Sequence, residues 1–83
     1  MTQAEARRKL KPSAKAILRT LRYFGKQGAE THSLMNVSYQ ANGRYYRGCS
    51  RYGARLHELR KAGYRIDSYP DRPGSYTYVL RSR

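Results

Sequence analysis

Apolar residues recur every three or four positions between Leu10 and Phe24, which is the spacing of one side of a helix. The residues that share this side are Leu10, Ala14, Ile17, Leu18, Leu21 and Phe24. Pro12 suits a first helical turn and Gly25 suits a C-terminal cap. The pattern therefore predicts a first helix from Pro12 to Phe24.

The next part of the chain has a weaker pattern with two interpretations. Ala29 to Thr31 is expected to form a short strand, and Thr31 is a candidate cap for a second helix that runs from His32 to about Tyr39 or Gln40. The turn dipeptide Asn42-Gly43, however, has strand-forming residues on both sides, which favours a small hairpin. Residues 37–47 therefore remain open between a loop, a hairpin and an extended second helix.

The clearest later helix begins near Ser50, a candidate N-cap. Tyr52, Leu56 and Leu59 follow at helical spacing, and Gly63 ends the run. We expect a third helix from Arg51 to Ala62.

After Gly63 the period changes to two. Tyr64 to Tyr69 and Ser75 to Leu80 are typical of strands, and Pro70 to Gly74 would form the tip of a hairpin. The order is helix, short strand, helix, helix, hairpin. It predicts an α+β fold, a winged helix-turn-helix of three helices plus a C-terminal β-hairpin wing, over residues 10–83.

Residues 1–9 have no apolar period and are expected to be a flexible basic arm.

Charge indicates the kind of partner. The 83 residues include 18 Lys and Arg against 5 Asp and Glu, a formal net charge of +13. Self-repulsion of this size works against a compact state, so a polyanion is the expected partner and nucleic acid is the first candidate. No long apolar run or lipidation motif points to a membrane. The basic N-terminus lacks the apolar stretch of a secretory signal, so a cytoplasmic location is expected.

Other chemistry is poorly represented. Cys49, His32 and His57 are too few for a structural zinc site. No paired carboxylates, activated nucleophile or phosphate-cradling glycine loop is found. We therefore expect no enzyme activity, no metal, no cofactor and no small-molecule substrate.

One stretch resembles a known group of proteins. From Cys49 to Ile66 the sequence is CSRYGARLHELRKAGYRI. It resembles small winged helix-turn-helix DNA-binding proteins of bacteriophages and prophages, which share Ser-Arg, a small residue and Arg, then His-Glu-Leu-Arg, Gly-Tyr and Ile. The resemblance extends from Gly48 to Leu80, and it implies duplex-DNA binding in a bacterial host cell, with the helix from Ser50 as the reader. Ala41 to Gly48 departs from the pattern because it is longer than a tight turn.

Candidate contact residues follow from these expectations. If Tyr52, Leu56 and Leu59 face the core, the base-reading residues are Arg51, Ala54 and Arg55, because Arg pairs well with guanine in the major groove. Glu58 is expected to pair with Arg55 or Lys61 along the helix. Tyr45 and Tyr46 can stack on bases or bond to phosphates, although core packing of at least one is expected. The candidates for contact with the DNA backbone or a groove are Arg7, Arg8, Lys9, Arg44, Tyr45, Tyr46, Arg47, Ser50 and Arg72.

The leading hypothesis is a phage-type regulator, either a transcription factor or an excisionase-like architectural factor, with a second copy or another DNA-bound protein as a further partner. Two alternatives remain. One is an RNA- or ribosome-binding basic protein. The other is a phage protein that binds and modulates a host nucleic-acid enzyme.

Overall fold

Helix α2 (Pro12–Phe24) forms the centre of the fold. The computed structural model describes residues 2–81, and its α2 has the bounds that the apolar pattern predicts. Pro12 lies at its start, and Gly25 caps its end with a φ of +57°. Its buried face carries Ala14, Ala16, Ile17, Leu18 and Leu21, and this face packs mainly against α4 (Tyr52–Lys61) and β2 (Ser38–Ala41). Residues 1, 82 and 83 lie outside the described part, so the ends of the predicted arm and domain lie outside it too.

The second helix is shorter than expected. Helix α3 (Thr31–Met35) ends at Met35, since the residues that follow pair as a strand instead of continuing the helix. Thr31 does not cap α3. Its Oγ1 accepts a 3.0 Å hydrogen bond from the backbone N–H of Tyr76 and donates to the carbonyl of the same residue at 3.3 Å. The side chain thus joins the start of α3 to the C-terminal hairpin.

Helix α4 begins at Tyr52, so its N-cap is Arg51 instead of the predicted Ser50. Arg51 occupies the cap position and makes no side-chain capping bond, while Ser50 lies in the preceding turn. Leu56 and Leu59 are buried as predicted, and Gly63 ends the helix region with a φ of +100°. The predicted boundaries are therefore wrong by one residue at each end.

A three-stranded antiparallel sheet packs beside the helices. Its order is β1 (Ala29–Glu30), β5 (Ser75–Leu80), β4 (Ile66–Arg72). The turn between β4 and β5 contains only Pro73 and Gly74, shorter than the predicted tip from Pro70 to Gly74. Pro70 is accommodated within β4 because this is an edge strand, and the register shifts between Pro70 and Arg72.

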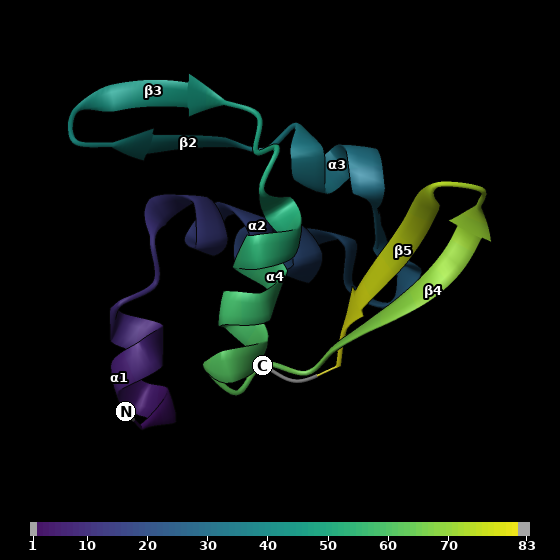
Figure 1. Cartoon of the computed structure of the whole chain (residues 1–83), viewed down its shortest axis with the longest axis horizontal. Coiled ribbons are helices and arrows are strands. Elements are labelled where there is room, and N and C mark those ends of the chain that lie inside the picture. The colour runs from purple at the N-terminus through teal and green to yellow at the C-terminus, as the bar shows by residue number, and fades with distance from the viewer. Residues whose placement is uncertain (1, 82–83) are drawn as a thin grey trace.

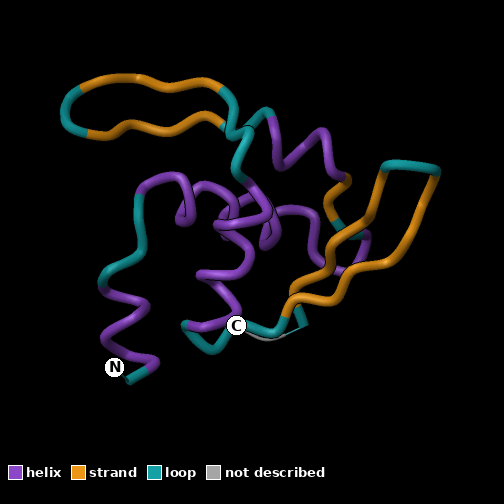
Figure 2. Tube along the Cα trace, in the orientation of Figure 1, coloured by secondary structure: helices purple, strands orange, loops and turns teal. Residues whose placement is uncertain are grey.

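A second hairpin, β2 with β3 (Arg44–Arg47), lies between α3 and α4. Asn42 and Gly43 form its two-residue turn with φ values of +54° and +77°, as a type I′ turn requires. Of the three interpretations of residues 37–47, the hairpin is therefore confirmed. Figure 1 shows the two hairpins projecting from different sides of the central helices, and Figure 2 shows the helical segments gathered between them.

Most of the N-terminal segment, predicted to be a flexible basic arm, is helical in this structure. Residues Gln3–Arg8 form helix α1, capped by Thr2, whose Oγ1 accepts a 3.2 Å hydrogen bond from the N–H of Glu5. The described residues thus contain four α-helices, with a short 3-10 turn at Gly25–Gln27, instead of the three helices predicted. The molecule is a small α+β domain of four helices and antiparallel strands.

Tyr52 and Tyr78 join α4 to β5. Their ring centroids lie 6.3 Å apart at an interplanar angle of 69°, an edge-to-face arrangement. Burial, with the neighbouring Tyr52 as a second cause, raises the pKa of Tyr78 above its ordinary value. The sheet is therefore attached to the first turn of α4 by an aromatic contact between the buried Tyr78 and the half-buried Tyr52.

Candidate nucleic-acid interface

Many of the cations on this domain have no partner within it. Among residues 2–81, the following Lys and Arg side chains make no hydrogen bond, ion pair or ring contact with another described residue: Arg8, Lys9, Lys11, Lys15, Lys26, Arg44, Arg47, Arg51 and Lys61. These charges are exposed to solvent. They are available to an external anion without breaking any contact within the fold.

The exposed side of α4 carries smaller side chains near its start than the sequence predicted. Leu56 and Leu59 face the core, and the residues on the opposite side of the helix are Gly53, Ala54, His57 and Lys61, all of them exposed. Outside its chain neighbours and the backbone of its own helix, no described atom lies within 4 Å of the position that a Cβ would take on Gly53. A partner can therefore approach the first turn of α4 closely.

Two of the three predicted base-reading residues lie at or near this side, and the third does not. Arg51 and Ala54 are exposed at the start of α4. The Arg55 side chain is only 15% exposed, and its Nη1 donates a 2.6 Å hydrogen bond to Oε1 of Glu58. The predicted pairing of Glu58 with Arg55 is confirmed, and this pairing turns Arg55 along the helix.

His57 and Lys61 were not among the predicted contact residues. A signal for them was present in the sequence. Because Leu56 and Leu59 fix the direction of the core, positions about half a helical turn away point outward, and Ala54, His57 and Lys61 occupy those positions. Arg55 falls at the border of the buried side.

The hairpin β2–β3 divides its predicted contact residues between two faces. Alternation along β3 places Arg44 and Tyr46 on one face and Tyr45 and Arg47 on the other. Tyr46 stacks on the cross-strand residue Tyr39, with centroids 5.3 Å apart and an interplanar angle of 16°. Tyr45 and Tyr46 are 62% and 39% exposed, so the expectation that one of them packs in the core is wrong.

The base of this hairpin is fixed to the rest of the fold. Beyond the paired strands, the N–H of Gly48 donates to the carbonyl of Val37 at 2.7 Å, and the N–H of Cys49 donates to that of Met35 at 2.6 Å. On the α2 side, Nη2 of Arg19 donates to the carbonyl of Ser38 at 3.2 Å. The hairpin therefore leads directly into the start of α4 from an anchored base.

Helix α1 presents only part of the basic run at its end. Arg7 Nε donates a 2.9 Å hydrogen bond to the carbonyl of Ala62, and the guanidinium lies 5.3 Å from the ring centroid of Tyr64. Arg7 thus attaches α1 to the end of α4, although the sequence placed it in a flexible arm. Arg8 and Lys9 remain exposed.

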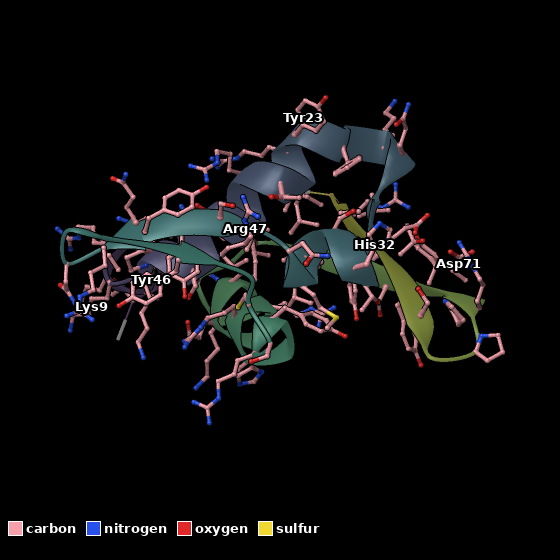
Figure 3. The ribbon with its side chains drawn as sticks, turned by 90° about the horizontal axis from the view of Figure 1, so that it is seen from above. Lys9, Tyr23, His32, Tyr46, Arg47 and Asp71 are labelled. Carbon is pink, nitrogen blue, oxygen red and sulfur yellow. The ribbon has the colours of Figure 1, made fainter. Side chains whose placement is uncertain are left out.

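The tip of the β4–β5 hairpin lies far from the β2–β3 hairpin. Arg72 is exposed, with its Nε 3.9 Å from a carboxylate oxygen of Asp71. Figure 3 places Asp71 at the opposite end of the molecule from Tyr46 and Lys9. Contacts by Arg72 and by the hairpin would therefore be widely separated on a bound polymer.

A groove of about 520 Å³ is formed where α2 packs on the β2–β3 hairpin. Its lining residues are Pro12, Lys15, Ala16, Arg19, Ser38, Tyr39, Gln40 and Tyr45. A smaller pocket of about 160 Å³ lies at the base of the hairpin beside Arg51 and Arg55. Nε of Arg55 is buried there without a hydrogen-bond partner among the described residues.

The part of the chain from residue 2 to 81 contains no group of three or more His, Cys, Asp or Glu side chains placed to hold a metal ion. Within the same range, no helix has both the length and the apolar character needed to cross a bilayer. Comparisons with models of protein families, with curated proteins and with solved structures find no match for this chain.

Proposed function

We propose that this chain is a winged helix-turn-helix protein that binds duplex DNA through the exposed side of α4. The order of elements supports this assignment: α2, β1, α3 and α4 are followed by the β4–β5 hairpin, with β1 paired to β5. This is the element order expected for a winged helix, with the β2–β3 hairpin in place of the tight turn before α4.

The observation that carries the proposal is the distribution of unpartnered cations around α4. Arg51 lies at its start, Lys61 at its end, and Arg44 and Arg47 on the hairpin that leads into it. Between them the helix presents small side chains at Gly53 and Ala54. Cations around a helix face that allows close approach suit insertion into a major groove with phosphates on either side.

In this proposal the contacts have different roles. Arg51 and Ala54, with His57 one turn further on, face base edges, whereas Arg44, Tyr46 and Lys61 contact the backbone. Ser50, Arg8 and Lys9 extend the backbone contacts, and Arg72 at the wing tip makes a separate one. Arg55 acts through its ion pair with Glu58 and supports the helix instead of reading bases.

The proposed role is that of a regulator or architectural factor of the phage type, which the resemblance of residues 48–80 to such proteins implies. The experiment that tests it is selection of bound sequences from a random duplex pool, followed by affinity measurements against salt concentration. We expect a defined motif and a decrease in log K with log[salt] whose slope is about −0.9 for each phosphate contacted.

The matched variants are Ala54→Glu and Ser68→Glu. Both residues are exposed and both changes add one negative charge, but only Ala54 lies on α4. Ala54→Glu should abolish selective binding, and Ser68→Glu should only weaken binding slightly. Equal losses in the two variants, or a pool without any enriched motif, would contradict the proposal.

A further inference from the structure

The groove between α2 and the β2–β3 hairpin has walls of two different kinds. Lys15 and Arg19 from α2 form a cationic wall, and Tyr45 with Gln40 from the hairpin forms an aromatic and amide wall. Its volume of about 520 Å³ is that of a small-ligand site and is too small for a duplex. None of Lys15, Arg19 or Gln40 belongs to the duplex-binding surface proposed above.

The cationic wall has unused hydrogen-bond donors. Lys15 has no partner among the described residues, and Arg19 uses one donor, Nη2, for the carbonyl of Ser38. A guanidinium has five N–H donors and an ammonium has three, so most of those on this wall are free. Because the Arg19 bond also joins α2 to β2, the spacing of the two walls is set by the fold.

The aromatic wall also presents side chains that make no hydrogen bond or ring contact with other described residues. Tyr45 is 62% exposed and makes no ring contact or hydrogen bond with any residue from 2 to 81. Its cross-strand partner is Gln40, and both side chains line the groove. A planar ring beside an amide that can donate and accept hydrogen bonds offers a stacking surface and an edge contact to one base.

We infer that this groove binds one nucleotide unit of a single strand, with the base stacked on Tyr45 and the phosphate held by Lys15 and Arg19. The chemistry requires a phosphodiester and an unpaired base, which both DNA and RNA single strands provide. In duplex DNA the bases are already stacked on one another, so a duplex cannot place a base on Tyr45 without losing that stacking. The site therefore stands independently of duplex binding by α4.

The test uses Tyr45→Trp in the full chain, which introduces the only tryptophan of this sequence. We expect an oligothymidylate to quench the indole fluorescence in a saturable manner, because a stacked base changes the surroundings of the ring. The reference variant is Tyr23→Trp, since Tyr23 is 84% exposed and lies outside the groove. It should show little quenching at the same concentrations.

A second pair of variants identifies the phosphate contact. In the Tyr45→Trp background, Lys15→Ala should weaken single-strand binding by about tenfold, since both a charge and a groove wall are lost. Lys26→Ala removes the same charge from an exposed residue just beyond α2 and outside the groove, and should weaken it by about twofold or less. Circular dichroism of each variant checks that the fold is retained.

The outcomes separate the ligand sources. Quenching by oligothymidylate or by oligouridylate supports the site, and the difference between the two shows how the sugar affects binding. Absence of quenching, the same quenching by inorganic phosphate at matched ionic strength, or equal effects of Lys15→Ala and Lys26→Ala would overturn it. The duplex affinity of the Ala54→Glu variant is measured separately. A failure of duplex binding by α4 can therefore be distinguished from a failure of single-strand binding in the groove.

Discussion

The guanidinium of Arg55 and the carboxylate of Glu58 form an ion pair of 2.6 Å along one turn of α4. The Arg55 side chain is only 15% exposed, whereas Glu58 is 35% exposed. A carboxylate therefore neutralises the positive charge that the sequence suggested for base contact. This pair has a direct consequence for affinity.

Replacing Glu58 by Gln should strengthen duplex binding. The change removes a negative charge near the proposed interface and leaves the charge of Arg55 without its carboxylate partner, so we expect about a 2- to 10-fold gain in affinity at low salt, with a slope of log K against log[salt] steeper by up to about 0.9. Fluorescence anisotropy at several salt concentrations measures both. Asp67→Asn is the control, because it removes one negative charge from the wing. An equal gain there would attribute the effect to net charge alone.

Arg51→Ala should change which sequences are bound as well as how tightly. A guanidinium paired with guanine contributes about 1–3 kcal/mol of discrimination against a wrong base. We therefore expect one position of the selected motif to lose its preference. Arg44→Ala, on the hairpin, should weaken all sequences about equally and reduce the salt slope by about 1. If Arg44→Ala alters the motif and Arg51→Ala does not, the two roles are reversed.

Arg7 and Arg8 are neighbours whose replacement should have different effects. Arg7→Ala removes the bond to the Ala62 carbonyl and the contact with Tyr64, which we expect to cost about 1 kcal/mol and lower Tm by about 4–8 °C. Arg8 has no partner among the described residues, so Arg8→Ala should leave Tm unchanged and weaken DNA binding. Thermal unfolding followed by circular dichroism, together with anisotropy, separates the two. A lower Tm for Arg8→Ala would contradict this assignment.

Gly28, just before β1, lies closely packed against β5. Its φ of +81° and ψ of +157° belong to a region that essentially only glycine adopts, and a Cβ there would overlap Cγ2 of Thr77. Gly28→Ala should destabilise the fold by about 3 kcal/mol or more. Gly74→Ala, at the wing turn, also has a positive φ but open space, and should cost only about 1–2 kcal/mol. Urea unfolding measures both, and equal losses would show that the overlap with Thr77 is relieved.

Alkaline pH should destabilise the fold through Tyr78. Because burial raises the pKa of this phenol in the folded state, the unfolded state loses its proton first as pH rises. The contribution is fully present below the unfolded pKa of about 10 and is lost as pH rises through the higher folded value. Urea unfolding between pH 8 and 11 should show a steeper decline for the natural sequence than for Tyr78→Phe. Parallel declines would show that other groups dominate.

The sequence predicted those parts of the fold that depend on local patterns. Helix α2 was located to the residue because its apolar stripe and its two end residues, Pro12 and Gly25, agree. The Asn42-Gly43 turn indicated the hairpin for the same reason, since its conformation is a property of those two residues. The end of α3 at Met35 was missed because pairing with β3 outweighs a weak helical preference.

The parts that were missed depend on contacts between distant residues. Arg7 bonds to a carbonyl 55 positions away, and no periodicity in residues 1–9 indicates it. Thr31 was a reasonable cap by its type, but its hydroxyl is used by Tyr76 in the wing. In the candidate site, the exposure of Arg51 and Ala54 agrees with helical spacing, whereas the inward turn of Arg55 and the groove at Lys15 could be seen only in the packed structure.

The anchored base of the β2–β3 hairpin also bears on how such a protein can change over generations. Because the bonds from Gly48 to Val37 and from Cys49 to Met35 close the loop before α4 begins, residues can be added or removed near Asn42 without displacing that helix. The length and sequence of the hairpin tip can therefore vary while the core stays constant.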